Sequence, residues 1–180
     1  PAEALGVNLL LFAESSSDSA AQIAPHLVGD YRDLEALKEF AKRCDFITFE
    51  HELVPNGHIR ALEAEGFVIR PSSKSLLVAQ DKAHMRQTFT ENQIPCPEWK
   101  VVDNASAIPK FPAILKSITG GYDGRGVQLV KDEISAKKVI GEWGKALYEE
   151  VVPFDRELSI LIARSPHNQV ATWAVTETIQ

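Results

Sequence analysis

Hydrophobic and polar positions follow two different patterns along the chain, and the change between them falls near residue 94. In the first half, short apolar runs alternate with segments in which apolar residues recur at helical spacing. The apolar runs predict strands over 6–12, 26–30, 45–50 and 67–71. The helical spacing predicts helices that begin near residues 20, 33, 57, 72 and 81. Such alternation of strands and helices is typical of a parallel, doubly wound sheet.

The second half is predicted to contain mostly strands. Two prolines in "NQIPCPEW" interrupt the earlier pattern, so we place a domain boundary there, between residues 1–94 and 95–180. Beyond the boundary we expect one helix over 135–143, and strands over 99–102, 113–117, 127–130, 146–151, 157–163 and 170–177. These elements indicate a small α+β unit.

Composition narrows the class of protein. The 180 residues are 44% hydrophobic and 24% charged, as in an ordinary globular protein. A net charge of −6 argues against non-specific binding to nucleic acid or to an anionic membrane surface, although it allows a local basic pocket. The longest apolar run, Leu9 to Ala13, is far too short to span a membrane. Cys44 and Cys96 form neither a metal-binding pattern nor a disulfide framework, which favours a cytoplasmic protein.

The segment "ILKSITGGYDGRGV", residues 114–127, contains four glycines within seven positions after a predicted strand. Gly121 and Gly126 have the spacing of a Walker A loop, but the lysine and hydroxyl that must follow are absent. The dinucleotide-binding pattern is also absent, because the glycine spacing is reversed and a strand follows instead of a helix. Neither of these two phosphate-binding loops fits the sequence.

A flexible glycine hairpin between two strands remains, and such a hairpin can fold over a nucleotide, as in protein kinases. Lys116, near the end of the incoming strand, is placed to contact a phosphate group. The alternative is a hairpin whose glycines serve only the geometry of the turn. The glycines alone do not decide between these alternatives.

Five segments, taken together and in order, resemble the 5-(carboxyamino)imidazole ribonucleotide synthetases, which are ATP-grasp enzymes of purine synthesis. They are "ITFEHELVP" (47–55), "QDKAHMRQTF" (80–89), "IPCPEW" (94–99), "LKSITGGYDGRG" (115–126) and "YEEVVPFDRELSILIAR" (148–164). The resemblance implies an α/β protein, with a Rossmann-like pre-ATP-grasp domain followed by the small α+β lid domain of the ATP-grasp fold. It also implies that the family's first strand with its glycine-rich turn, and its C-terminal ATP-grasp region, are missing from these residues.

Several residues match positions that contact the nucleotide in this family. Lys82 and Lys116 resemble the two cations that bind phosphate groups, a task suited to a flexible ammonium group. Glu157 resembles the acceptor of the ribose hydroxyls. The remaining matches are the loop glycines Gly120, Gly121, Gly124 and Gly126, the adenine-binding connector Glu149, Glu150, Val151 and Val152, and Gln180 close to the nucleotide.

Other residues resemble the family's substrate contacts. Tyr122, Asp123 and Arg125 lie on the substrate side of the loop, and Asp123 resembles the carboxylate that holds the substrate amine and accepts its proton. The resemblance therefore implies catalytic roles for Asp123 and Arg125. Glu50 resembles a further substrate contact, with Glu52 as its companion. The alternative is that Asp123 and Arg125 form a solvated pair and that Glu50 is a surface residue.

The implied reaction consumes ATP, Mg²⁺ and bicarbonate, and carboxylates 5-aminoimidazole ribonucleotide through carboxyphosphate. The resemblance also implies a homodimer, and it places the Mg²⁺ ligands in the C-terminal region, so we expect no metal site and no turnover from these residues alone. Two alternatives stay open. One is another ATP-grasp carboxylate–amine ligase, and the other is a nucleotide-binding module without catalytic activity.

Overall fold

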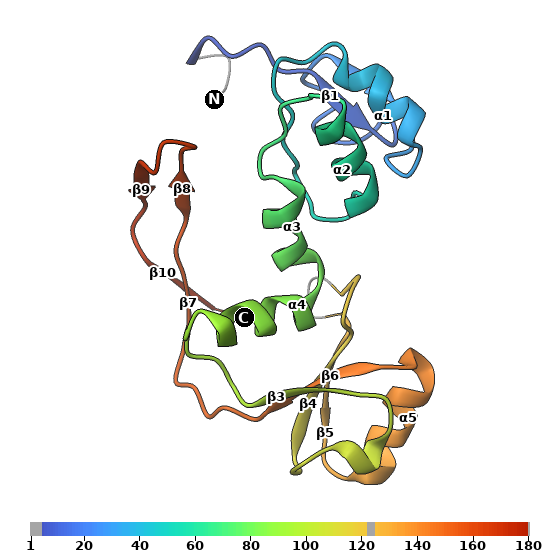
Figure 1. Ribbon diagram of the computed structural model, residues 1–180, viewed down its shortest axis with the longest axis vertical. Coiled ribbons are helices and arrows are strands. Elements are labelled where there is room, and N and C mark those ends of the chain that lie inside the picture. The colour runs from blue at the N-terminus through green and yellow to red at the C-terminus, as the bar shows by residue number, and fades with distance from the viewer. Residues whose placement is uncertain (1–4, 122–124, 180) are drawn as a thin grey trace.

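The computed structural model describes residues 5–121 and 125–179 of the protein. Figure 1 shows three parts: an N-terminal unit, a C-terminal unit built on a sheet, and an arm of strands at the end of the chain. Each of the two units has its own cluster of buried apolar side chains. Helices α3 and α4 connect the units (Figure 1).

The N-terminal unit packs helices against a small amount of parallel β-structure. Strand β1 (Leu11–Ala13) pairs in parallel with β2 (His26–Val28), and the helices are α1 (Leu34–Ala41), α2 (Asn56–Ala64) and α3 (Ser73–Gln80). Its core contains Leu37, Ile59, Leu62 and Ile69. The side chains of Ile59 and Ile69 are fully buried, so this unit has a well-packed centre.

This unit contains fewer and shorter strands than the sequence pattern predicts. The expected strands over 45–50 and 67–71 form a single parallel bridge between Ile47 and Ile69, and the strand expected over 6–12 is shortened to β1. Residues 20–23 form a turn in place of the expected helix. An apolar run supplies residues suited to a strand, but it does not supply the neighbouring backbone with which a strand must pair.

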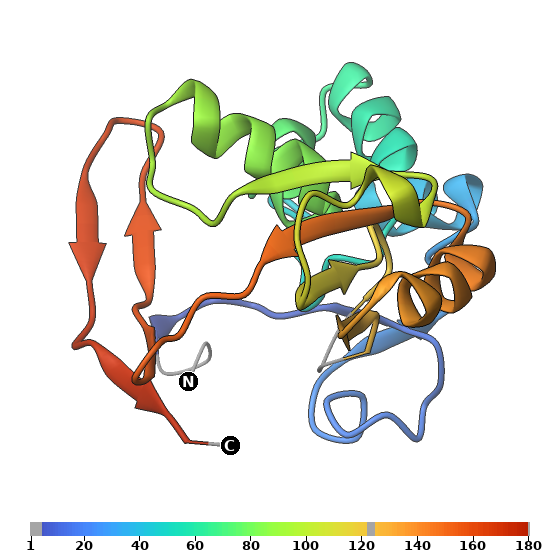
Figure 2. The ribbon, with the colours of Figure 1, turned by 90° about the horizontal axis from the view of Figure 1, so that it is seen from below.

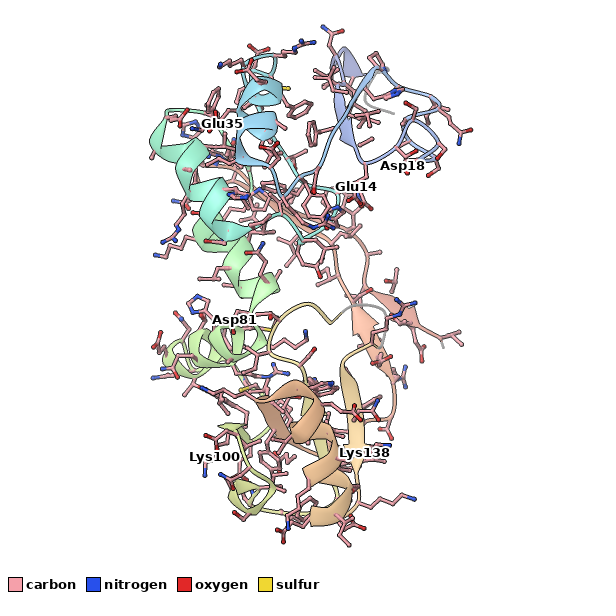
Figure 3. The ribbon with its side chains drawn as sticks, turned by 90° about the vertical axis from the view of Figure 1, so that its right-hand side faces the viewer. Glu14, Asp18, Glu35, Asp81, Lys100 and Lys138 are labelled. Carbon is pink, nitrogen blue, oxygen red and sulfur yellow. The ribbon has the colours of Figure 1, made fainter. Side chains whose placement is uncertain are left out.

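Helix starts were predicted more accurately, because capping depends on local side-chain chemistry. An Asp33 carboxylate oxygen accepts hydrogen bonds from the first turn of α1, and the Ser72 hydroxyl accepts one from the first turn of α3. Asp81 accepts from the backbone N–H of His84 and begins α4 (Lys82–Glu91). Figure 3 labels Asp81, the residue at which α3 ends and α4 begins.

The C-terminal unit is a four-stranded antiparallel sheet with the strand order β3–β6–β4–β5. The strands are β3 (Trp99–Val102), β4 (Ala113–Lys116), β5 (Val127–Val130) and β6 (Ala146–Glu150), and the helices are α5 (Glu133–Trp143) and the 3₁₀-helix η2 (Ala105–Ala107). Helix α5 starts two residues before the expected position, because Asp132 and Ser135 form a capping box.

The two faces of this sheet have different partners. Leu115 and Tyr148 are paired across β4 and β6, and they belong to the same buried cluster as Ala136 and Ile140 of α5. Side chains alternate between the faces of a strand, so Lys116 and Glu149 lie on the opposite face. The face of the sheet that does not contact α5 therefore carries the charged side chains of Lys116 and Glu149.

The last strands form an extended arm. Strand β7 (Glu157–Ser159) pairs with β10 (Thr176–Thr178), and β8 (Ile162–Arg164) pairs with β9 (Val170–Thr172), so each of the two expected strands is divided in two. All of the residues in these four strands are exposed. Figure 2 shows the arm, in red, standing apart from the sheet. Within 5–121 and 125–179, no helix has the length and apolar character needed to cross a bilayer.

Candidate functional site

Basic side chains from two different elements meet where α4 crosses the sheet. Lys82 and Arg86 are four residues apart on α4 and therefore lie on one face of that helix. Lys116 ends β4, and Glu149 lies on the neighbouring strand β6. We call Lys82, Arg86, Lys116 and Glu149 the charged cluster.

Glu149 is the centre of the charged cluster. Its Oε1 accepts a hydrogen bond from Arg86 Nε at 2.6 Å, and its Oε2 lies 2.7 Å from Lys116 Nζ. The Glu149 side chain is only 5% exposed, compared with 14% for Arg86 and 24% for Lys116. Each carboxylate oxygen thus has a cationic partner of its own, which is the condition under which a buried carboxylate is tolerated.

Burial by itself would raise the pKa of the Glu149 carboxyl, because it penalises the charged form. The hydrogen bonds from Arg86 and Lys116 outweigh this effect and hold the pKa of Glu149 below its ordinary value. Glu149 is therefore ionised at neutral pH. The single negative charge of Glu149 faces two cations directly, so the site keeps a net positive charge that favours an anion.

Hydrogen bonds fix the start of α4 against the glycine loop. The backbone N–H of Lys82 donates to the carbonyl oxygen of Ile118 at 2.9 Å, and Asp81 forms an antiparallel bridge with Thr119. The Lys82 ammonium group donates to the carbonyl oxygen of Gly121 at 3.3 Å. The loop and the first cation of α4 are therefore held as one unit.

The glycine loop is tightly folded at its base. The backbone N–H of Ser117 donates to the carbonyl oxygen of Gly126 at 2.8 Å, so the hydrogen bonding of β4 and β5 continues into the loop. A Cβ atom at Gly121 would lie 2.6 Å from Ser117 Oγ and 2.7 Å from the carbonyl oxygen of Arg125. Ser117 Oγ is buried and has no hydrogen-bond partner within the described ranges. These close approaches explain why glycine is required here.

Gly126→Ala is expected to destabilise the protein more than Gly66→Ala does. The two glycines have φ angles of +74° and +92°, so both changes strain the backbone, but an added Cβ at Gly126 would also overlap Ser117, whereas an added Cβ at Gly66 would have no neighbouring atom within 4 Å. Backbone strain costs about 1–2 kcal/mol at each position, and the overlap adds about 1–3 kcal/mol at Gly126 alone. Urea unfolding of the two variants measures this difference, and equal losses of stability would contradict the account.

A cleft of about 350 Å³ lies beside the loop. It is lined from the N-terminal unit by Glu52 and residues 53–56, from the end of α3 and the start of α4 by Gln80 and Lys82, and from the loop by Gly120 and Gly121. The Gln80 amide nitrogen donates to the carbonyl oxygens of Glu52 and Val54, each at 2.7 Å. Gln80 thereby holds the segment that carries Glu52 against the helices next to Lys82.

The structure brings some of the predicted site residues together and leaves others apart. Lys82, Gly120, Gly121 and Glu52 line the cleft, and Lys116 and Glu149 belong to the charged cluster. Glu50 is exposed and is not one of the residues that line the cleft. Gly126 lies at the base of the loop and Arg125 is exposed beside it. The predicted roles of Tyr122, Asp123, Gly124 and Gln180 concern residues outside the described ranges.

The connector after β6 is open to solvent. Val151 and Val152 are 42% and 44% exposed. A Glu150 carboxylate oxygen accepts from the backbone N–H of Glu98 at 3.0 Å, so this side chain fixes the connector to the start of β3. Glu157 is exposed on β7.

The sequence interpretation overlooked Arg86, Ser117 and Gln80. Arg86 could have been found from its spacing, because it follows Lys82 by one helical turn. Ser117 and Gln80 gave no comparable signal, since their roles depend on the folded loop and on the segment 52–54.

Comparisons with known proteins identify the family of the chain. The model of the ATP-grasp domain family matches residues 87–180. The chain belongs to the ATP-grasp family. The model of the ribonucleotide synthetase preATP-grasp domain matches residues 1–80. The ATP-grasp assignment confirms the fold class expected from the sequence, namely a pre-ATP-grasp domain followed by an ATP-grasp domain.

Relatives of known function extend the comparison. This ATP-grasp chain is 39% identical to the N5-carboxyaminoimidazole ribonucleotide synthase of Mycobacterium bovis, over 98% of this chain and 44% of that protein. It is 32% identical to the enzyme of the same name from Synechococcus elongatus, over 99% of this chain and 48% of that protein. The resemblance seen in the sequence is therefore confirmed, and the chain spans about half the length of these relatives.

Solved structures show the same similarity. An N5-carboxyaminoimidazole ribonucleotide synthetase in complex with ADP has a TM-score of 0.90 and 26% identity, over 99% of this chain and 50% of that one. The synthetase from Thermus thermophilus has a TM-score of 0.87 and 30% identity, over the same shares of the two chains. The ATP-grasp fold of this chain thus corresponds to about half of each of these structures.

Proposed function

We propose that this chain is the nucleotide-binding portion of an enzyme that carboxylates 5-aminoimidazole ribonucleotide in purine biosynthesis. The reaction consumes ATP and bicarbonate and yields 5-carboxyaminoimidazole ribonucleotide, ADP and phosphate. The observation that carries this proposal is the charged cluster beside a glycine loop, in a chain similar to synthases of that name. We further propose that the two domains divide near residue 94.

The charged cluster and the loop bind the phosphate groups of ATP. Lys82 and Lys116 supply point charges that follow phosphate oxygens, and the loop glycines allow the backbone to approach them. Backbone groups of the exposed residues Val151 and Val152 pair with the adenine edge, and Glu157 accepts hydrogen bonds from the ribose hydroxyls. This assignment of roles is supported by the net positive charge of the site and by the ADP bound to a similar synthetase.

The substrate side of the loop carries out the carboxylation. A bicarbonate oxygen attacks the γ-phosphorus of ATP, so that ADP leaves and carboxyphosphate forms. The substrate amine, held by Asp123, attacks the carboxyl carbon and releases phosphate, and Asp123 accepts the amine proton. Tyr122, Arg125 and Glu50 orient the ribonucleotide. The loop excludes water, which would otherwise hydrolyse carboxyphosphate.

We also propose that the enzyme requires Mg²⁺ and works as a homodimer in the cytoplasm. Within 5–121 and 125–179, no group of three or more His, Cys, Asp or Glu side chains is arranged to hold a metal ion. No role in binding the ion is assigned to the described residues.

The test is ADP formation by the protein expressed with its natural ends, supplied with Mg-ATP and bicarbonate, with and without 5-aminoimidazole ribonucleotide. We expect ADP release only when the ribonucleotide is present, and we expect Asp123→Asn to reduce it at least about a hundredfold, as for a group that transfers a proton. ADP release with a different amine acceptor would contradict the assigned substrate. Nucleotide binding without any ADP release would indicate a non-catalytic module.

A further inference from the structure

Two cations share a single carboxylate at the centre of the charged cluster. Arg86 contacts Oε1 of Glu149, and Lys116 contacts Oε2. If Lys116 turned away, Glu149 would still have Arg86 as a partner. Without Arg86, Lys116 would be the only cation among the described residues that pairs with the Glu149 carboxylate.

Arg86 and Lys116 differ in their freedom to move. The Arg86 guanidinium is 14% exposed, and its Cζ lies 5.7 Å from the centre of the Phe89 ring, on the same helix. A guanidinium is planar and permanently charged, and it suits a fixed pairing. Lys116 is 24% exposed and carries its charge on a flexible stem, next to the glycine loop. Lys116 is therefore the cation that can reach a ligand.

We propose that Arg86 is a positioning residue for nucleotide binding, which retains the Glu149 carboxylate when Lys116 turns toward a phosphate group. This inference rests on the proposed function, because it requires a polyphosphate ligand. Without Arg86, binding of Lys116 to phosphate would leave a buried carboxylate without a cation, and an unpaired buried charge is strongly unfavourable. Lys116 would then stay on Glu149, and the nucleotide would bind more weakly.

Calorimetric titration with ADP tests this role in the protein expressed with its natural ends. Arg86→Met is expected to raise the Kd for ADP about tenfold and to change kcat less than about threefold, because its effect is on binding. Arg86→Lys keeps the charge and is expected to bind ADP within about threefold of the unmutated protein. The matched control is Arg43→Met, which removes an exposed arginine next to α1 and is expected to leave the Kd unchanged.

A double variant separates positioning from a merely structural role. In Arg86→Met with Glu149→Gln, no negative charge remains to hold Lys116, so we expect the ADP affinity to recover to within about threefold of the unmutated protein. This variant also removes the unbalanced buried charge, so it tests the proposal even when Arg86→Met alone does not fold. A double variant that binds ADP as weakly as Arg86→Met would overturn the proposal. So would an Arg86→Met variant that folds and binds ADP normally.

Measurements of ADP binding and turnover by the unmutated protein separate a failure of this proposal from a failure of the proposed function. Tight ADP binding without turnover of 5-aminoimidazole ribonucleotide would refute the carboxylation, while the Kd values of the Arg86 variants would still decide the role of Arg86. An unmutated protein that does not bind ADP would overturn both.

Discussion

Lys116→Met is expected to bind ATP about a hundredfold more weakly than the unmutated protein, since a charged hydrogen bond contributes about 1.5–3 kcal/mol and each 1.4 kcal/mol changes affinity tenfold. The variant should remain folded, because Arg86 still pairs with the Glu149 carboxylate at 2.6 Å. Calorimetric titration with a non-hydrolysable ATP analogue measures the loss.

The matched control for this loss is Lys138→Met. Lys138 is an exposed lysine on α5 (Figure 3), and its replacement removes the same charge without touching the charged cluster. We expect its affinity for the analogue to equal that of the unmutated protein. Equal weakening in the two variants would show that overall charge, and not the position of Lys116, controls binding.

Glu149→Gln is expected to lower the free energy of unfolding by about 3 kcal/mol at pH 7, which is the scale for removing one partner of a buried ion pair. The change keeps the shape of the side chain but leaves Arg86 and Lys116 next to each other without an anion. Urea unfolding measures the loss. The control is Glu142→Gln, an exposed change on α5 that should cost no more than about 0.5 kcal/mol.

The difference in stability between the unmutated protein and Glu149→Gln is expected to depend on pH. The pKa of Glu149 is lowered in the folded protein, so its ionisation stabilises the fold above the ordinary carboxyl pKa, and this contribution is lost as the pH falls through the lowered value. The stability difference between the unmutated protein and Glu149→Gln should therefore be largest near neutral pH and shrink in acid. A difference that stays constant into acid would contradict the paired state of Glu149.

Local features of the fold, such as helix starts, could be predicted from the sequence, but the pairing of strands could not. Asp33, Ser72 and Asp81 begin their helices as expected, because a capping side chain acts on backbone within three residues. The segment around Ile47 was expected to be a strand and forms only a bridge, because its pairing depends on residues far away in the sequence. The fold class itself came from the resemblance and is confirmed by the family models.

In the candidate site, too, local features could be predicted from the sequence and contacts between distant residues could not. Lys82, Lys116 and the glycine loop could be found because they lie in recognisable segments, and the structure places Lys82, Lys116, Gly120 and Gly121 around one small region. The resemblance suggested Glu149 only as part of the adenine-binding connector, and it did not suggest that its side chain pairs with Arg86. That contact joins α4 to β6 across sixty-three positions of sequence, and no local pattern encodes it.

The most direct test of the central claim follows an oxygen atom from bicarbonate. The protein with its natural ends is supplied with Mg-ATP, 5-aminoimidazole ribonucleotide and ¹⁸O-labelled bicarbonate, and the released phosphate is analysed by mass spectrometry. Attack of bicarbonate on the γ-phosphorus predicts that the phosphate carries ¹⁸O from bicarbonate. Release of ADP together with unlabelled phosphate would contradict the account, because the phosphoryl group would then have been transferred to water or to another acceptor.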